Sequence, residues 1–94
     1  MKGTKIEGTG LLHKSTNTKI VHLFLEAGED IKPHNHEGNT IYFMVCKGAL
    51  DLYLDGNEHH DLQGGNLLMF DGSSMISAKA KEKSDIYVFL IKND

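Results

Sequence analysis

Short apolar runs, separated by glycine and polar turns, cover most of the chain. No stretch of helix length carries its apolar residues at the 3.6-residue period of an amphipathic helix. Alternation with a period of two is clearest in residues 50–55, where three leucines are interleaved with Asp51, Tyr53 and Asp55. Asp55-Gly56-Asn57 then gives a strong hairpin signal. The pattern predicts an all-β protein with roughly eight to ten short strands, arranged as a sandwich or barrel.

Three predicted strands are apolar on both faces: residues 20–25, 42–46 and 86–91. Such strands are expected to be covered on two sides. In a protein this small the second cover implies a partner surface, so we expect a homodimer. The glycine-rich residues 1–14 are predicted to be an edge strand or an arm that pairs with another subunit.

The sequence His34-Asn35-His36 follows the chain's single proline, Pro33. If this segment is extended, both imidazoles project to the same face and could hold a metal or another ligand. The proline places the segment at a strand end or at a sheet edge, because proline has no amide hydrogen for a central ladder.

Length and composition limit the function further. The 94 residues form one domain, and ten basic against thirteen acidic residues give a formal charge of -3 without a basic patch. We therefore expect no nucleic-acid partner. Cys46 is the only cysteine, which excludes an intrachain disulfide. No apolar run approaches the roughly 18 residues of a membrane span, and the N-terminus lacks a signal-peptide core, so we expect a cytoplasmic protein without membrane contact.

The spacing of Gly28, His34, His36 and Gly48 resembles the first motif of the cupin superfamily, with Ile41 at a position that is usually glutamate. A degenerate second motif starts at Gly65 and has Asp71, Ser73 and Ile76 where proline, glycine and histidine are usual. The resemblance covers about residues 20–91. It implies a double-stranded β-helix, or jelly-roll barrel, commonly dimeric, whose usual metal site takes three ligands from the first motif and one from the second.

Only His34 and His36 carry over as metal ligands, because isoleucine at positions 41 and 76 has no lone pair to donate. A catalytic zinc normally has three protein ligands and a structural zinc four, so this pair alone predicts a weak site. A third ligand could be recruited from Glu37, Asp71, His22, His59 or His60, although none is spaced as part of a set.

The preferred hypothesis is a small stand-alone cupin that binds a small molecule in its barrel, with a two-histidine partial metal site. An apolar pocket with a few polar groups is the usual design of such sites. The candidate ligand-binding residues are His34, His36, Ile41, Phe43, Val45, Phe70 and Ile76.

Two alternatives remain open at this stage. The first is a metal-dependent enzyme, an oxygenase, isomerase or lyase, in which His34 and His36 hold Fe, Mn, Ni or Zn with an unidentified third ligand. The second is a structural or protein-interaction module. The other histidines, including His13, are interpreted as surface or interface residues, and the acidic residues 51, 55, 58 and 61 as a solvated sheet edge.

Overall fold

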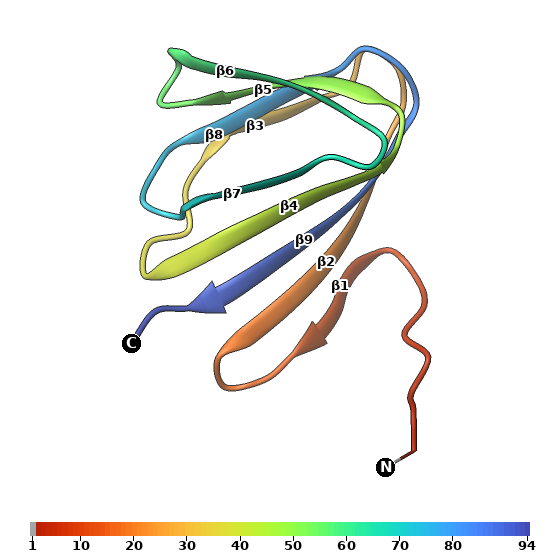
Figure 1. Ribbon diagram of the computed structural model, residues 1–94, viewed down its shortest axis with the longest axis vertical. Helices are drawn as coiled ribbons and strands as arrows, with labels where there is room; N and C mark the ends of the chain where they lie inside the picture. The colour runs from red at the N-terminus through yellow and green to blue at the C-terminus, as the bar shows by residue number, and fades with distance from the viewer. Residues whose placement is uncertain (1) are drawn as a thin grey trace.

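Nine strands joined by short turns make up the computed structural model, which describes residues 2–94 (Figure 1). Within this range no helix has the length and apolar character that a membrane crossing would need. The strands are β1 (Gly10–Lys14), β2 (Thr18–Leu25), β3 (Asp30–His34), β4 (Asn39–Lys47), β5 (Ala49–Leu54), β6 (Glu58–Gln63), β7 (Leu67–Asp71), β8 (Ile76–Ala80) and β9 (Ser84–Lys92).

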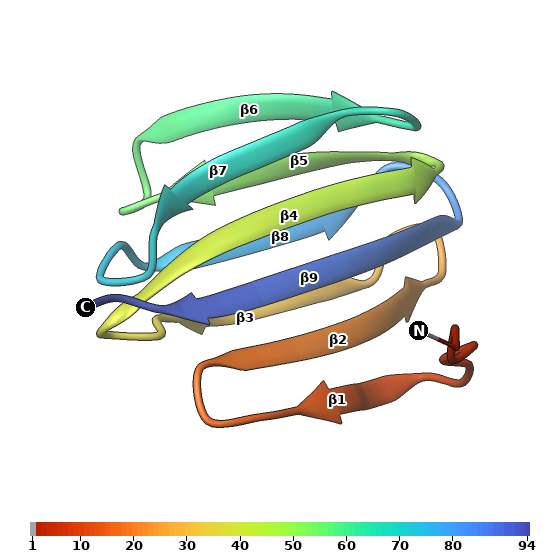
Figure 2. The same cartoon turned by 60° about the horizontal axis from the view of Figure 1, so that its bottom comes forward.

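The strands form two antiparallel sheets that face each other as layers (Figure 2). One sheet has five strands in the order β1-β2-β9-β4-β7, and the other has four in the order β3-β8-β5-β6. The chain passes from one sheet to the other after β2, β3, β4, β6, β7 and β8, so most neighbours within a sheet are distant in sequence. This arrangement is a jelly roll, which confirms the predicted fold class.

The core lies between the two sheets and follows the predicted period of two. Ile41, Phe43 and Val45 of β4 are each at most 1% exposed. Their neighbours in sequence, on the opposite face of the strand, are only half-buried. The same alternation holds in β5, β8 and β9, whose inward side chains complete the core: Leu50, Leu52, Leu54, Ile76, Ala78, Ala80, Ile86, Val88 and Leu90.

The predicted hairpin joins β5 to β6. Asp55 and Gly56 have φ values of 55° and 74°, in the left-handed region where aspartate and glycine are tolerated better than other residues. The Asn57 amide donates to the Leu54 carbonyl across the turn at 3.2 Å. The hairpin prediction is therefore confirmed.

Strand β1 lies at the edge of the five-stranded sheet and pairs with β2 of its own chain; residue 1 of the predicted segment 1–14 lies outside the described residues. Residues 2–9 precede it without regular structure, and His22 tethers them: its Nδ1–H donates to the Gly8 carbonyl at 2.6 Å, while Nε2 contacts the Asp85 carboxylate. Because both ring nitrogens face acceptors, these bonds raise the pKa of His22. Exchange of this arm with another subunit stays a prediction.

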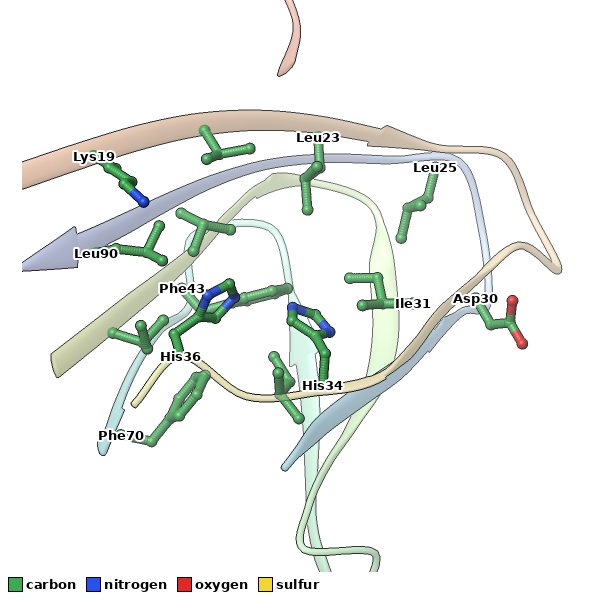
Figure 3. Close-up of a pocket in the computed structure, with 14 residues that line it drawn as sticks. Lys19, Leu23, Leu25, Asp30, Ile31, His34, His36, Phe43, Phe70 and Leu90 are labelled. Carbon is green, nitrogen blue, oxygen red and sulfur yellow. The ribbon is translucent and has the colours of Figure 1, made fainter. Parts of the chain in front are cut away.

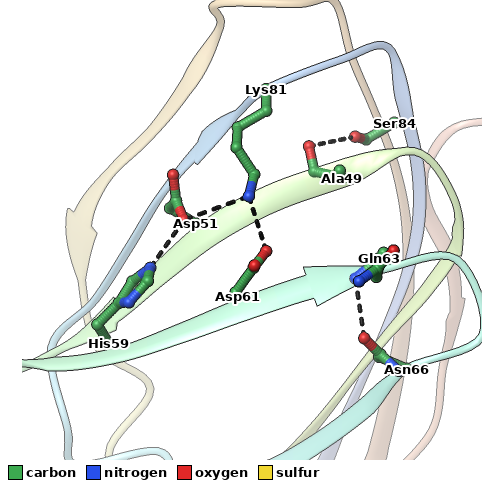
Figure 4. Close-up of polar contacts among 8 residues, drawn as sticks. All are labelled: Ala49, Asp51, His59, Asp61, Gln63, Asn66, Lys81 and Ser84. Carbon is green, nitrogen blue, oxygen red and sulfur yellow. Dashed lines mark hydrogen bonds and ion pairs between the residues drawn. The ribbon is translucent and has the colours of Figure 1, made fainter.

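The outer face of the four-stranded sheet is polar (Figure 4). Asp51 accepts a hydrogen bond from His59 at 2.7 Å, and Lys81 bridges Asp51 and Asp61 at 3.7 and 2.7 Å. The His59 contact is the main reason that the pKa of Asp51 is lowered. The predicted acidic surface is therefore present: Asp51, Glu58 and Asp61 lie beside basic side chains, and the Asp55 carboxylate accepts from the Met75 amide at 2.9 Å.

The outer face of the five-stranded sheet is instead apolar. Phe24 of β2 and Met69 of β7 are 46% and 62% exposed. Within the single chain Phe24 is thus left largely open on this face, with the Lys83 ammonium 5.1 Å from its ring. Cover of residues 20–25 by a partner subunit stays a prediction. Between these two residues the face carries half-buried Tyr42, Met44, Cys46, Tyr87 and Phe89.

Candidate ligand-binding cavity

A cavity of about 450 Å³ lies between the two sheets (Figure 3). Its walls come from β2, β4, β7 and β9 of one sheet and from β3 and β8 of the other, with His36 following β3. Ten of its fourteen lining residues are aliphatic or aromatic, and the polar ones are Lys19, Asp30, His34 and His36. The volume falls within the usual range for small-molecule sites, about 300–1,000 Å³.

The two histidines are positioned by an edge strand and by the loop that follows it. β3 is an edge strand that pairs only with β8, and this pairing is irregular between Ile31 and His34, so Pro33 lies at a sheet edge as predicted. His34 lies opposite Ile76 in this pairing. Beyond the strand, the His36 amide donates to the Gly72 carbonyl at 2.7 Å, which fixes the loop against the turn between β7 and β8.

The two imidazoles point into the same cavity, with ring centroids 4.7 Å apart and planes at 89° (Figure 3). The prediction that the rings share one face is confirmed. His34 Nδ1–H donates to the Lys32 carbonyl at 2.8 Å, and Nε2 has no hydrogen-bond partner among residues 2–94. Burial, and then electrostatic repulsion from His34 and Lys19, lower the pKa of His36.

The residues around this pair do not complete a metal site. Among residues 2–94 no cluster of three or more His, Cys, Asp or Glu side chains is placed to hold an ion. Ile76 and Ile41, which stand where the cupin resemblance implies ligands, are 4% and 1% exposed and present only hydrocarbon to the cavity. The cavity supplies two nitrogen donors, fewer than the three or four protein ligands that zinc usually takes.

The other ligand candidates lie elsewhere. His22 is on the outer face with Asp85, and His60 pairs with Glu58 at 2.6 Å. The Asp71 carboxylate accepts from the Ser73 amide at 2.9 Å, which lowers the pKa of Asp71. His59 belongs to the outer network described above, and Glu37 lines a neighbouring hollow. None of these five side chains lines the cavity.

Six of the seven predicted ligand-binding residues line the cavity: His34, His36, Ile41, Phe43, Phe70 and Ile76. Val45 does not, and its assignment is wrong. It faces inward like Ile41 and Phe43, but β4 continues past the cavity, and Val45 is fully buried in the closed part of the core. Strand parity predicts which face a residue takes, but it does not predict where along the strand the core is filled.

One wall of the cavity was not predicted from the sequence; it is formed by the inward side of β2: Lys19, Val21, Leu23 and Leu25. The odd-numbered positions of residues 19–25 share one face, but apolar residues occupy both faces of this strand. The sequence alone therefore does not show which face lines a cavity. Gly72 was also missed. A side chain there would overlap the carbonyl oxygen of His36, and no sequence pattern indicates this close approach.

No family model matches the sequence, and no curated protein is significantly similar to it. Solved structures do match. An RmlC-like cupin from Methanocaldococcus jannaschii has a TM-score of 0.84 at 18% identity, over 98% of this chain and 93% of that one. An RmlC-like cupin from Desulfovibrio desulfuricans has a TM-score of 0.81 at 21% identity, over 97% of this chain and 91% of that one. A cupin superfamily protein from Desulfitobacterium hafniense has a TM-score of 0.78 at 18% identity, over 94% of this chain and 84% of that one. The protein therefore has the double-stranded β-helix fold of the cupin superfamily.

Proposed function

We propose that the protein is a small cupin that binds an organic small molecule in the cavity between its sheets. The observation that carries this proposal is the cavity itself, an apolar space of about 450 Å³ with two imidazoles directed into it. Hydrocarbon on most of the wall favours a ligand with an apolar body, and the few polar groups would orient it. A cytoplasmic location, as expected from the sequence, belongs to this proposal.

The metal-dependent enzyme is less well supported as a function. The free Nε2 of His34, with Nδ1–H held by a backbone carbonyl, is a tautomer that suits a metal ligand. A third protein ligand is nevertheless missing from the cavity wall, where the two isoleucines stand. The same two isoleucines suit an apolar ligand. Binding of such a ligand therefore accounts for hydrocarbon at the positions where a metal site would need donors.

Filling the cavity should weaken ligand binding. Leu23→Trp places an indole in the space that β2 borders, so its affinity for a neutral apolar probe, 1-octanol, should fall at least about tenfold, or about 1.4 kcal/mol. Phe24→Trp is the matched control, because it adds the same ring on the outer face of the same strand. Binding is measured by methyl NMR titration, and thermal melts check that both variants fold. Equal affinities in the two variants would contradict the proposal.

We further propose that the apolar outer face of the five-stranded sheet pairs with a second copy of the chain. The outer face of the four-stranded sheet carries ion pairs, whereas that of the five-stranded sheet exposes apolar side chains. Only the second face would gain stability by being buried in an interface. At one end of the apolar face, near the start of β9, the Asp85 carboxylate is paired with His22, so a two-fold related copy meets no isolated carboxylate there. A self-complementary surface of this kind suits an isologous dimer.

Sedimentation should therefore detect a dimer at micromolar concentration, and Met69→Glu should dissociate it because the charge would be buried in the interface. Tyr53→Glu, on the polar face, is the control and should leave the dimer intact. A wild-type monomer, or a dimer broken only by the control variant, would refute this assembly.

A further inference from the structure

Positive charge is concentrated on one side of the cavity. Lys19 comes from the inward side of β2, and its ammonium points into the cavity on the side where His36 lies (Figure 3). It is close enough to lower the pKa of His36. Among the described residues no carboxylate lies within ion-pair distance of Lys19; the lysines that do have such a partner are Lys5, Lys32 and Lys81.

The one acidic residue of the cavity wall does not compensate this charge. Asp30 lies at the far end of the cavity from Lys19 in Figure 3, and its carboxylate points outward. Its nearest cation is Lys32 on the same strand, at 3.9 Å. The two ends of the cavity therefore differ in charge, and the positive end adjoins the two imidazoles.

A second hollow of about 280 Å³ extends this positive region. It shares Lys19 and Leu90 with the cavity, so the two spaces adjoin at these residues. Lys14 and Lys92 line it as well, against the single carboxylate of Glu37. A ligand group near Lys19 would thus experience a net positive potential from both spaces.

From this arrangement we infer that the ligand is an amphipathic carboxylate, with its anionic group at Lys19 beside His36 and its hydrocarbon part among the apolar walls. The inference rests on the proposed binding function and names its ligand class. An apolar cavity alone would accept neutral molecules equally well. The unpaired ammonium adds a preference for anionic ligands. A carboxylate loses its hydrogen bonds to water when it enters the cavity, and a charge-assisted hydrogen bond from Lys19 replaces one of them. A cationic ligand would be repelled.

Two probes of nearly the same shape test this inference. Octanoate carries a carboxylate and octanamide an uncharged amide, and calorimetric titration should give about tenfold tighter binding of octanoate to the wild-type protein. Lys19→Met keeps the aliphatic stem without the charge and should remove this preference, while Lys19→Arg should retain it. Lys79→Met is the matched control, because it removes the same charge from the outer side of β8, away from the cavity.

The outcomes separate the inference from the function on which it rests. Preference for octanoate that is lost only in Lys19→Met supports the carboxylate site. Equal binding of both probes to the wild-type protein, or a preference that survives in Lys19→Met, overturns that site and leaves the binding function standing. Failure of both probes to bind at millimolar concentration overturns the inference together with the proposed function. Lys19 is exposed, so thermal melts of its variants should match the wild type.

Discussion

The double variant Ile41→Glu/Ile76→His should bind zinc at least about 100-fold more tightly than the wild-type protein, or about 2.7 kcal/mol. Ile76 is the cross-strand partner of His34, and such partners have Cβ atoms about 4.5–5.5 Å apart on one face of the sheet. Ile41 lines the same cavity from the opposite sheet. The variant would thus supply four ligands, the number that a structural zinc takes. Calorimetric titration with zinc measures the gain.

Controls for this variant come from the chain itself. Removing both original imidazoles, by adding His34→Ala and His36→Ala to the double variant, should return zinc affinity to the weak wild-type level. The buried glutamate should lower the melting temperature without metal, and zinc should restore it, because binding to the folded state stabilises that state. Tight zinc binding by the wild-type protein would contradict the account of an incomplete site.

Gly72→Ala should destabilise the protein by about 2–4 kcal/mol. The glycine is buried in the turn after β7, where its amide donates to the Asn39 carbonyl at 2.8 Å and its carbonyl accepts from the His36 amide. A Cβ would overlap the His36 carbonyl oxygen and lie 2.6 Å from that of Asn39. Because backbone atoms cannot swing aside as a side chain can, the loop carrying His36 must shift. Urea denaturation measures the loss.

The matched control is Gly3→Ala, since a Cβ at Gly3 would meet nothing within 4 Å and neither glycine has a left-handed φ. Its free energy of unfolding should stay within about 0.5 kcal/mol of the wild-type value. NMR shifts of the His36 ring should change in Gly72→Ala and remain unchanged in Gly3→Ala. Equal stability of the two variants would show that the close approach at Gly72 does not restrain the loop.

Much of the fold could be predicted from local patterns, because a strand with one buried face must alternate. The leucines of β5 and the alanines of β8 show this alternation within a few residues. The turn between β5 and β6 is likewise indicated locally, by Asp55 and Gly56. The shared orientation of the two histidine rings was predicted correctly for the same reason, since one intervening residue in extended backbone directs both rings to one side.

What sequence reasoning missed depends on contacts between distant segments. Lys19 reads as a surface charge until β2 is placed opposite β3 across the cavity. Phe24 reads as core because apolar residues occupy both faces of its strand, yet one of those faces has no second layer in this chain. Val45 and Gly72 depend on where the two sheets approach most closely, and strand periodicity contains no such information.

The central claim is that the space beside His34 and His36 receives the apolar body of a ligand, and intermolecular NOEs test it most directly. With methyl-labelled protein and 1-octanol, the account predicts NOEs from the ligand chain to the methyl groups of Ile31, Ile41 and Ile76, which line the cavity. Contacts confined to Met69 and Leu67 on the outer face, or no NOEs at saturating octanol, would contradict it.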